Sequence, residues 1–205
     1  MVPPPSRPSG HHHGDLRNAL EQAALALVAE RGAHGFSLAE ASRRAGVSVA
    51  APYKHFTDKD TLLAELARKG YEQQYERFAA AMADHQDPVE QLAAFAAAYV
   101  QFTADHKALF EITFSAGLKK QLHPRLAQAG DRVLELLREP AAHLAATTAE
   151  QDEIIRTVGA SAHGFAAFLA EGVFGEPTTA LQATKLRAAD AARRLARDPL
   201  LPGAQ

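Results

Sequence analysis

The sequence predicts an all-α protein of about nine helices. Ala and Leu, which favour helices, are abundant among the 205 residues, whereas runs of β-branched and aromatic residues, which favour strands, are scarce. Apolar residues recur at intervals of three and four along most of the chain, the spacing that gives a helix one apolar face. Gly, Pro and helix-capping residues separate these periodic stretches.

The first 60 residues predict three short helical stretches. One begins near a cap at Asp15 and ends at Gly32, and a second begins at Ser37, where Ser37 and Glu40 match the capping-box pattern. Gly46 provides the flexible residue of a tight turn. A third helix follows over 48–55, and because Pro52 lies near its fourth residue, we expect its first turn to be tightened or irregular.

Longer helices are predicted in the rest of the chain. Asp58 is the expected cap of a helix that runs to about His85, and Asp87-Pro88 opens the next one. The remaining expected helices cover about 107–115, 124–139, 141–148, 150–175 and 178–197. Met1–Gly10 and Asp198–Gln205 are rich in Pro and are expected to be flexible.

Composition excludes several classes of protein. The chain has no Cys, which removes disulfides, thiolate catalysis and thiolate metal sites, and which fits a reducing cytosol. No apolar run is long enough to cross a bilayer, so we expect a cytoplasmic protein without a membrane partner. Residues 1–60 hold seven Lys/Arg against six Asp/Glu (+1), and the rest holds fifteen against eighteen (−3), a weak asymmetry in the direction of a DNA-binding N-terminal part.

The two helices on either side of Gly46 have the spacing of a helix-turn-helix motif, whose second helix lies in the major groove of DNA. The segments Phe36–Glu40, Gly46–Ser48, Pro52–Phe56 and Asp58–Leu62 resemble the TetR family of one-component bacterial regulators. This resemblance covers about residues 14–62. It divides the chain into an N-terminal arm (1–13), a helix-turn-helix DNA-binding domain (14–62), a helical ligand-binding and dimerisation body (63–197) and a tail (198–205).

The resemblance also implies a role for individual residues. Tyr53, His55 and Lys59 match positions that contact DNA phosphate, while Val49, Ala50 and Ala51 match positions that face the bases. Ser37 and Ser48 are helix caps first and phosphate contacts second. Arg43, Arg44 and Lys54 are expected to contact bases or backbone, and ordinary solvated surface charge is the alternative for these three.

Helices expected near the C-terminus predict a dimer interface. The 154–174 helix is apolar on more than one face, so a second surface must cover it. With the last helix it is expected to form a four-helix interface between two copies, and packing within a single chain is the alternative. The expected interface residues are Ile154, Val158, Ala162, Phe165, Leu169, Leu181 and Leu195. His163-Gly164 resembles a His-Gly pair of one C-terminal subclass of the family.

Aromatic residues of the body could line an apolar ligand pocket, although packing in the core explains each of them singly. These candidates are Phe95, Tyr99, Phe102, Phe110 and Phe114, together with His163. The histidines of the body lack the spacing of a metal-ligand pair, and no catalytic motif is present, so we expect no metal, no cofactor and no enzymatic activity.

These features predict a homodimeric repressor that a small apolar effector releases from a pseudo-palindromic operator in double-stranded DNA. The alternatives are a DNA-binding regulator without an effector, and an all-helical ligand carrier or enzyme.

Overall fold

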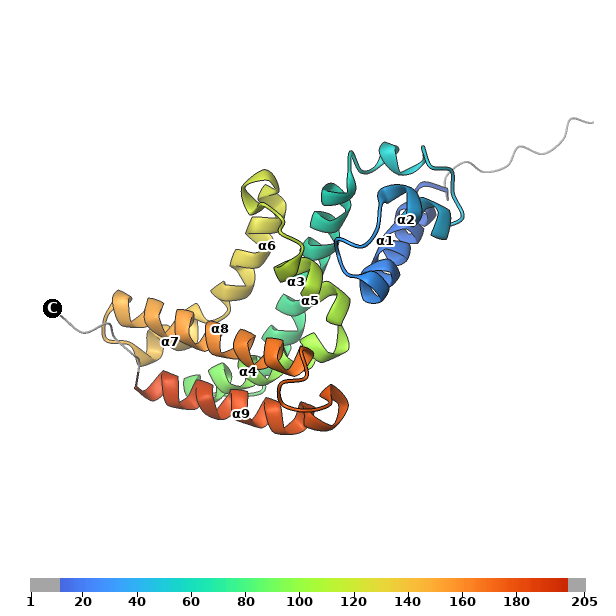
Figure 1. Ribbon diagram of the computed structural model, residues 1–205. Coiled ribbons are helices and arrows are strands. Elements are labelled where there is room, and N and C mark those ends of the chain that lie inside the picture. The colour runs from blue at the N-terminus through green and yellow to red at the C-terminus, as the bar shows by residue number, and fades with distance from the viewer. Residues whose placement is uncertain (1–11, 199–205) are drawn as a thin grey trace, which may run out of the picture.

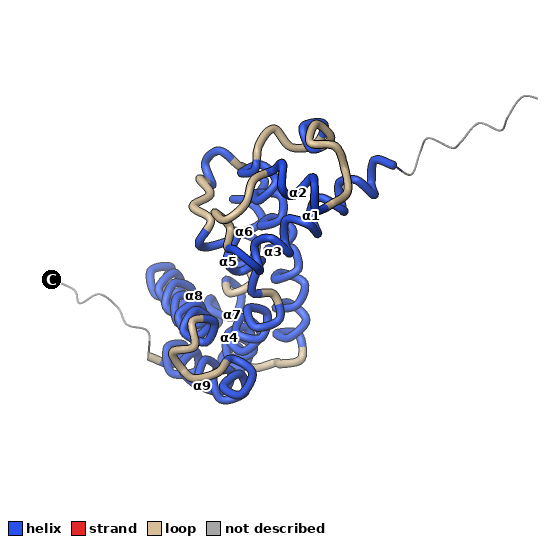
Figure 2. The backbone as a smooth tube through the Cα atoms, turned by 45° about the vertical axis from the view of Figure 1, so that its right-hand side comes forward, coloured by secondary structure: helices blue, strands red, loops and turns tan. Residues whose placement is uncertain are grey.

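The computed structural model describes residues 12–198, and every regular element in this range is a helix (Figure 1, Figure 2). The prediction of an all-α fold with about nine helices is therefore confirmed. The α-helices of the described range are α1 (His12–Arg31), α2 (Leu38–Arg44), α3 (Lys59–Ala83), α4 (Pro88–Asp105), α5 (Lys107–Ser115), α6 (Pro124–Glu135), α7 (Arg138–Leu144), α8 (Thr148–Ala170) and α9 (Pro177–Arg197). Two 3₁₀-helices, η1 (Pro52–Lys54) and η2 (Lys120–Leu122), complete them.

The helices form a small head and a larger body. The head consists of α1, α2, η1 and the start of α3, and it lies at one end of the molecule in Figure 1. In the body, α4, α8 and α9 pack against one another, and α3 packs against α4, α5 and α6. Because α3 begins in the head and ends in the body, it connects the two.

One continuous apolar cluster runs from the head into the body. At the head end, Leu62 and Leu66 of α3 are buried, with Leu20 and Leu27 of α1 in the same cluster. At the body end, Phe78 of α3 is fully buried among rings of α4. Its ring centroid lies 5.1 Å from that of Phe95, 5.5 Å from that of Tyr99 and 6.0 Å from that of Phe102.

Capping residues define the starts of α3 and α4, as the sequence predicted. The carboxylate of Asp58 accepts the N–H of Thr61 at 2.7 Å, and that of Asp87 accepts the N–H of Val89 at 2.9 Å. The hydrogen bond from the Thr61 backbone lowers the pKa of Asp58, so this cap remains ionised near neutral pH. Pro88 occupies the first position of α4, where a missing N–H costs nothing.

Three predicted helix boundaries need correction. Helix α1 begins at His12, ahead of the expected cap at Asp15 and inside the arm predicted over 1–13, because no residue of 12–15 is a Pro that would stop a helix. The remaining arm residues, 1–11, and the tail residues 199–205 lie outside the described range. Helix α6 ends at Glu135 rather than before Pro140, and Pro140 instead lies in the first turn of α7, where its missing N–H would have no helical partner.

Helix α8 also ends earlier than predicted, at Ala170 instead of near Gly175. Gly172 has a left-handed φ of +74°, and its N–H donates to the carbonyl of Leu169. The next N–H, that of Val173, donates to the carbonyl of Phe168 at 2.9 Å, which completes a Schellman motif and terminates the helix.

The predicted third helix, 48–55, is not an α-helix. Residues 48–51 form a turn and Pro52–Lys54 form the 3₁₀-helix η1, whose N-cap is Ala51, so the prediction that Ser48 caps a helix is wrong. Because Pro52 has no N–H, it cannot donate to the carbonyl of Ser48, which accepts the N–H of Ala51 instead. The expected irregularity is confirmed, and it extends over the whole segment.

The aromatic cluster around Phe78 predicts a large stability effect. We expect Phe78→Ala to lower the free energy of unfolding by about 3–5 kcal/mol, because it leaves a cavity in a fully buried core. Urea denaturation followed by circular dichroism measures this change. Leu122→Ala, at a side chain that is 70% exposed, is the control and should change stability by less than about 0.5 kcal/mol. A similarly small effect of Phe78→Ala would contradict the assignment of this cluster as the body core.

Candidate functional site

The candidate DNA-binding surface begins with the cap of α2. The Ser37 hydroxyl accepts the N–H of Glu40 at 3.3 Å, and the Glu40 carboxylate accepts the N–H of Ser37 at 2.9 Å. The predicted capping box is thus confirmed. The hydrogen bond from the Ser37 backbone lowers the pKa of Glu40. The exposed Ser37 side chain therefore has a structural role before any contact with DNA.

The turn after α2 depends on Gly46. This residue has a φ of +71°, in the left-handed region that a Cβ disfavours. The N–H of Gly46 donates to the carbonyl of Arg43 at 3.1 Å, and the N–H of Val47 donates to the carbonyl of Ser42 at 3.0 Å. This Schellman motif ends α2 and directs the chain into η1, while Val47 packs against the head core.

The segment between this turn and α3 brings most of the predicted DNA contacts to the surface. Pro52 is buried and anchors it, whereas Tyr53 is 62% exposed and Val49 is 49% exposed. The exposed predicted residues of this segment are Ser48, Val49, Ala50, Tyr53 and Lys54.

Three polar side chains of this surface are available to a ligand. Arg43, Tyr53 and Lys54 are exposed, and their side chains make no hydrogen bond or ion pair with any residue that the structure describes. A phenol, an ammonium and a guanidinium are all donors to an anionic oxygen. This combination suits phosphate.

Other predicted DNA contacts are engaged within the protein. Arg44 forms a two-point ion pair with Glu30, and Ala51 and His55 are half-buried. The His55 ring lies beside that of Phe56, with 6.4 Å between the ring centroids. The structure therefore separates the predicted set into an exposed group around η1 and a group that supports it.

Lys59 belongs to the supporting group. Its Nζ donates to the carbonyls of Ala33 (3.2 Å) and Phe36 (3.3 Å), and it lies 5.3 Å from the centroid of the Phe36 ring. The first residue of α3 thereby holds the loop between α1 and α2. A contact between Lys59 and DNA phosphate stays a prediction. The two carbonyls accept two of the three ammonium N–H groups, so only the third is available to phosphate.

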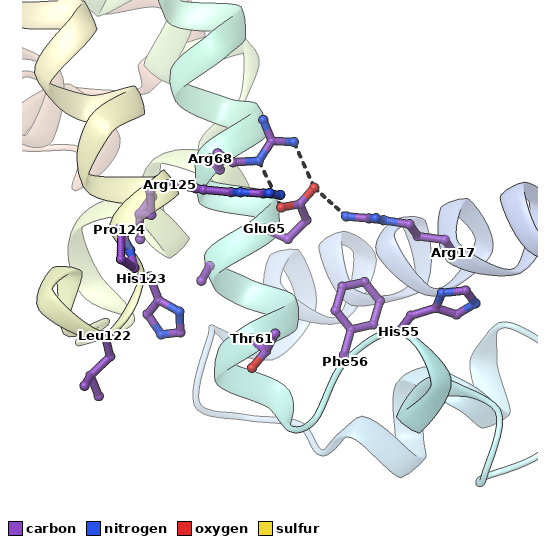
Figure 3. Close-up of a pocket in the computed structure, with 12 residues that line it drawn as sticks. Arg17, His55, Phe56, Thr61, Glu65, Arg68, Leu122, His123, Pro124 and Arg125 are labelled. Carbon is purple, nitrogen blue, oxygen red and sulfur yellow. Dashed lines mark hydrogen bonds and ion pairs between the residues drawn. The ribbon is translucent and has the colours of Figure 1, made fainter.

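Two sets of contacts join head and body. In Figure 3, Glu65 of α3 bridges Arg17 of α1 and Arg68 of α3, beside an open cleft of about 550 Å³ between the head and the start of α6. The second set centres on Ala33. Its N–H donates to Oε1 of Glu111 at 2.8 Å, so that α5 holds the same peptide segment that Lys59 holds from α3.

The body contains a cavity of about 180 Å³ between α3, α4, α5, α6 and α8. Four of the predicted pocket residues line it: Phe95, Tyr99, Phe114 and His163. Phe102 and Phe110 do not. Phe102 is buried against Phe78, and Phe110 stacks on His163 behind the cavity wall, with 5.3 Å between the ring centroids.

Tyr99 and His163 form a hydrogen-bonded pair in this wall. The Tyr99 hydroxyl lies 3.1 Å from Nδ1 of His163. Burial raises the pKa of Tyr99 and lowers the pKa of His163, so the hydroxyl keeps its proton and the imidazole is neutral at pH 7. The His163 tautomer sets the direction of the bond: the hydroxyl donates to a bare Nδ1, or a protonated Nδ1 donates to the hydroxyl oxygen.

Sequence reasoning missed the contribution of α3 and α6 to the cavity. Tyr71 and Gln74 of α3 line it, as do Gly130 and Val133 of α6. A signal was available at Gln74, since this polar residue lies at helical spacing between Tyr71 and Phe78 on a buried face. A side-chain amide on a buried, apolar helix face needs a hydrogen-bond partner, which is either another group of the protein or a ligand.

The predicted dimer residues of α8 require a correction. Ile154, Val158, Ala162 and Leu169 are at most 1% exposed and belong to the core that α8 shares with α4 and α9. A helix with apolar residues on two faces does not reveal from sequence which face is internal. These four residues therefore pack within the chain.

Another apolar surface lies on the outer side of α8 and α9. Phe165, Leu181 and Leu195, which were also predicted at the interface, are half-buried. Phe168 is 49% exposed, and the rings of Phe165 and Phe168 both lie beside that of Phe174. A hollow of about 440 Å³ beside Phe165 and Leu195 is edged by Arg187, Asp190 and Arg194.

No group of three His, Asp or Glu side chains in the described range is placed to hold a metal ion. Within the same range, no helix combines the length and apolarity needed to cross a membrane.

Family models match both parts of the chain. The model for "Bacterial regulatory proteins, tetR family" matches residues 21–66, and the model for "Tetracyclin repressor-like, C-terminal domain" matches residues 92–195. The first match covers the capping box, the Gly46 turn, η1 and the start of α3, and the second covers most of the body. No curated protein matches the chain.

Solved structures share the fold. A protein of unknown function from Rhodococcus sp. RHA1 is 27% identical, with a TM-score of 0.72, over 91% of this chain and 98% of that one. A regulatory protein of the tetR family from Rhodococcus RHA1 is 15% identical, with a TM-score of 0.71, over 88% of this chain and 96% of that one. The fatty acid degradation regulator FadR from Bacillus halodurans is also 15% identical, with a TM-score of 0.68, over 95% and 99% of the two chains.

A further structure with this fold contains a ligand. It is the transcriptional regulator FadR from Bacillus subtilis in complex with stearoyl-CoA, which is 15% identical, with a TM-score of 0.64, over 89% of this chain and 98% of that one.

The lowered pKa of His163 predicts a pH-dependent stability. Between the ordinary imidazole pKa of about 6.5 and the lower value in the folded protein, the unfolded chain binds more protons. Stability should therefore fall as the pH is lowered through 6.5. His106, whose pKa burial also lowers, adds to the same loss.

The measurement is urea denaturation at pH 7.5 and pH 5.5 for the wild type and for His163→Phe. The variant should lose less stability between the two pH values, whatever its stability at pH 7.5. An equal loss in both proteins would show that His163 does not titrate as its surroundings require.

Proposed function

The chain belongs to the TetR family of DNA-binding transcriptional regulators, and from this membership we propose that it is a homodimeric repressor released from its operator by a small molecule. The two heads of the dimer would enter successive major grooves of a pseudo-palindromic operator, about 34–36 Å apart. This is a regulatory rather than an enzymatic role. It is exercised in the cytoplasm, where a bacterial operator is accessible.

The observation that supports the operator contact best is the exposed surface around η1. Arg43, Tyr53 and Lys54 have no partner among the described residues, and they flank a segment that two ordered turns and the buried Pro52 hold in place. A fixed backbone with free cationic and hydroxyl donors suits contacts with phosphate, which set the register of a protein on DNA.

Base readout by this head is limited. Val49, Ala50 and Ala51 carry only small apolar side chains, which can contact a thymine methyl but cannot form a hydrogen bond with a base edge. Much of the specificity should then come from positioning and from the shape and deformability of the operator.

The outer surface of α8 and α9 is the proposed dimer interface. Phe165, Phe168, Ala191 and Leu195 form an apolar face there, and charged residues edge it. A buried apolar centre with a polar rim is the usual anatomy of an interface. The four core residues of α8 then stabilise the helix pair that presents this face.

The cavity on α3 is the proposed effector site. Its walls belong to α3, which starts in the head, and to α5, which holds Ala33 of the head through Glu111. A ligand that alters the packing of these helices would change the orientation of the head, which is coupling through two arrangements of one element. The stearoyl-CoA of Bacillus subtilis FadR would not fit this cavity, because about 150 Å³ is the volume that encloses one benzene.

Substitutions on the surface around η1 test the DNA contact. We expect Tyr53→Phe and Lys54→Ala to weaken binding to the operator and to unrelated DNA by similar factors, because phosphate contacts carry no sequence information. Lys54→Ala should also reduce the slope of log K against log salt concentration by about 1. Fluorescence anisotropy at several salt concentrations measures both effects.

Lys107→Ala, at an exposed lysine of the body, is the matched control and should leave affinity and slope unchanged. Altered preference at a single base pair of the operator, without weaker binding to unrelated DNA, would contradict the phosphate role of Tyr53 and Lys54.

A second prediction concerns the dimer. Phe168→Glu combined with Ala191→Glu, a residue that lines the hollow, should shift the protein to a monomer in analytical ultracentrifugation, because two carboxylates would be buried in an apolar interface. Operator affinity should fall with it. Leu122→Glu, at an exposed leucine outside this face, should stay dimeric. If the double variant remains dimeric, the interface lies on another surface.

A further inference from the structure

The cavity of the body is just large enough for one aromatic ring. Its volume is about 180 Å³, and a cavity of about 150 Å³ is known to enclose one benzene molecule. One ring with a short substituent fits this space, whereas a long acyl chain exceeds it. Gly130 and Gly159 help to keep the space open, since a Cβ at Gly130 would lie only 3.2 Å from the Tyr71 ring.

The walls of the cavity are mostly aromatic and apolar. Phe95 and Tyr99 of α4 form one side, Phe114 of α5 another, and Val133 and Leu134 of α6 a third. Aromatic rings attract one another in tilted and edge-to-face arrangements. The rings of the wall already adopt tilted arrangements, Phe95 with Tyr99 and Phe114 with Phe110. The walls favour an aromatic ligand over a polar one.

One buried polar atom in the wall has no partner. Gln74 is 2% exposed, and its Oε1 forms no hydrogen bond in the structure. Leaving a buried acceptor unpaired costs stability, and a ligand that donates a hydrogen bond to it removes that cost. A hydroxyl fits either orientation of the Gln74 amide, because it can donate to the oxygen or accept from the nitrogen.

The charges at the cavity exclude an anionic ligand. Neither Lys nor Arg lines it, and the exposed carboxylate of Asp131 lies at its edge. A carboxylate or phosphate inside would be desolvated without a cation to pair with. A cation would be desolvated as well, because the one carboxylate of the lining, that of Asp131, is exposed at the edge, so the cavity favours a neutral ligand.

From these four observations we propose that the cavity binds a neutral single-ring phenol, whose hydroxyl pairs with the side-chain amide of Gln74. The proposal rests on the function proposed above for this cavity and adds the chemical class of the effector. Gln74 would be the residue that distinguishes a phenol from a hydrocarbon of the same shape.

The test compares 4-ethylphenol with ethylbenzene, which differ only in the hydroxyl. Isothermal titration calorimetry on the full chain should show 4-ethylphenol binding at least about tenfold more tightly. In Gln74→Leu the preference should reverse, because the buried hydroxyl then loses water without gaining a partner. Gln74→Met, of closer shape, should behave in the same way. Gln128→Leu, at an exposed residue on another face of α6, is the control and should keep the preference.

Three results would overturn the proposal: equal binding of both probes to the wild type, a preference for 4-ethylphenol that survives in both Gln74 variants, or no binding of either probe because water alone fills the cavity. Operator release is measured separately, by anisotropy with labelled operator DNA. Selective binding of 4-ethylphenol without release would support the ligand class and reject the effector-controlled release.

Discussion

Helix α3 is buried in both the head and the body part of one continuous core, and the rest of the molecule is arranged around this constraint. Its 25 residues span about 37 Å, with Leu62 and Leu66 buried in the head and Phe78 buried in the body. Asp58 fixes where the helix starts, and Lys59 ties that start to the loop between α1 and α2. The head therefore cannot reorient without a change in how α3 packs in the body.

A second connection reinforces the first. Glu111 of α5 binds the N–H of Ala33, while Lys59 of α3 binds its carbonyl, so both neighbouring helices hold one peptide segment of the head. The same two helices supply Phe114 and Gln74 to the cavity wall. A cavity bounded by the two elements that position the head is well placed to alter that position. These contacts are sufficient to couple the cavity to the head, and no longer chain of contacts is required.

Much of this arrangement could be predicted from residues whose effect is local. The caps at Ser37 and Asp58 and the left-handed turn at Gly46 follow from side-chain chemistry within a few residues, and the structure has all three. The irregular turn around Pro52 follows from a missing N–H in the same way.

Features that depend on distant contacts could not be predicted so well. The apolar residues of α8 occur on two faces, and only packing against α4 and α9 shows that Ile154 and Val158 are internal. Likewise, the aromatic residues of the body are similar in type but lie in different places. Phe102 lies in the core, whereas Phe95 lines the cavity. Gln74 is a polar residue on an apolar helix face, which the sequence shows, but only the structure shows that it lines a cavity.

The most direct test of the coupling through α3 is the distance between the two heads of a dimer, with and without a ligand in the cavity. The chain has no Cys, so His34→Cys, in an exposed loop of the head, gives one spin label per subunit. Pulsed electron paramagnetic resonance should show a different head-to-head distance when 4-ethylphenol fills the cavity. An unchanged distance distribution at saturating ligand, with binding confirmed by calorimetry, would contradict the role of α3 as the element that transmits cavity occupancy to the head.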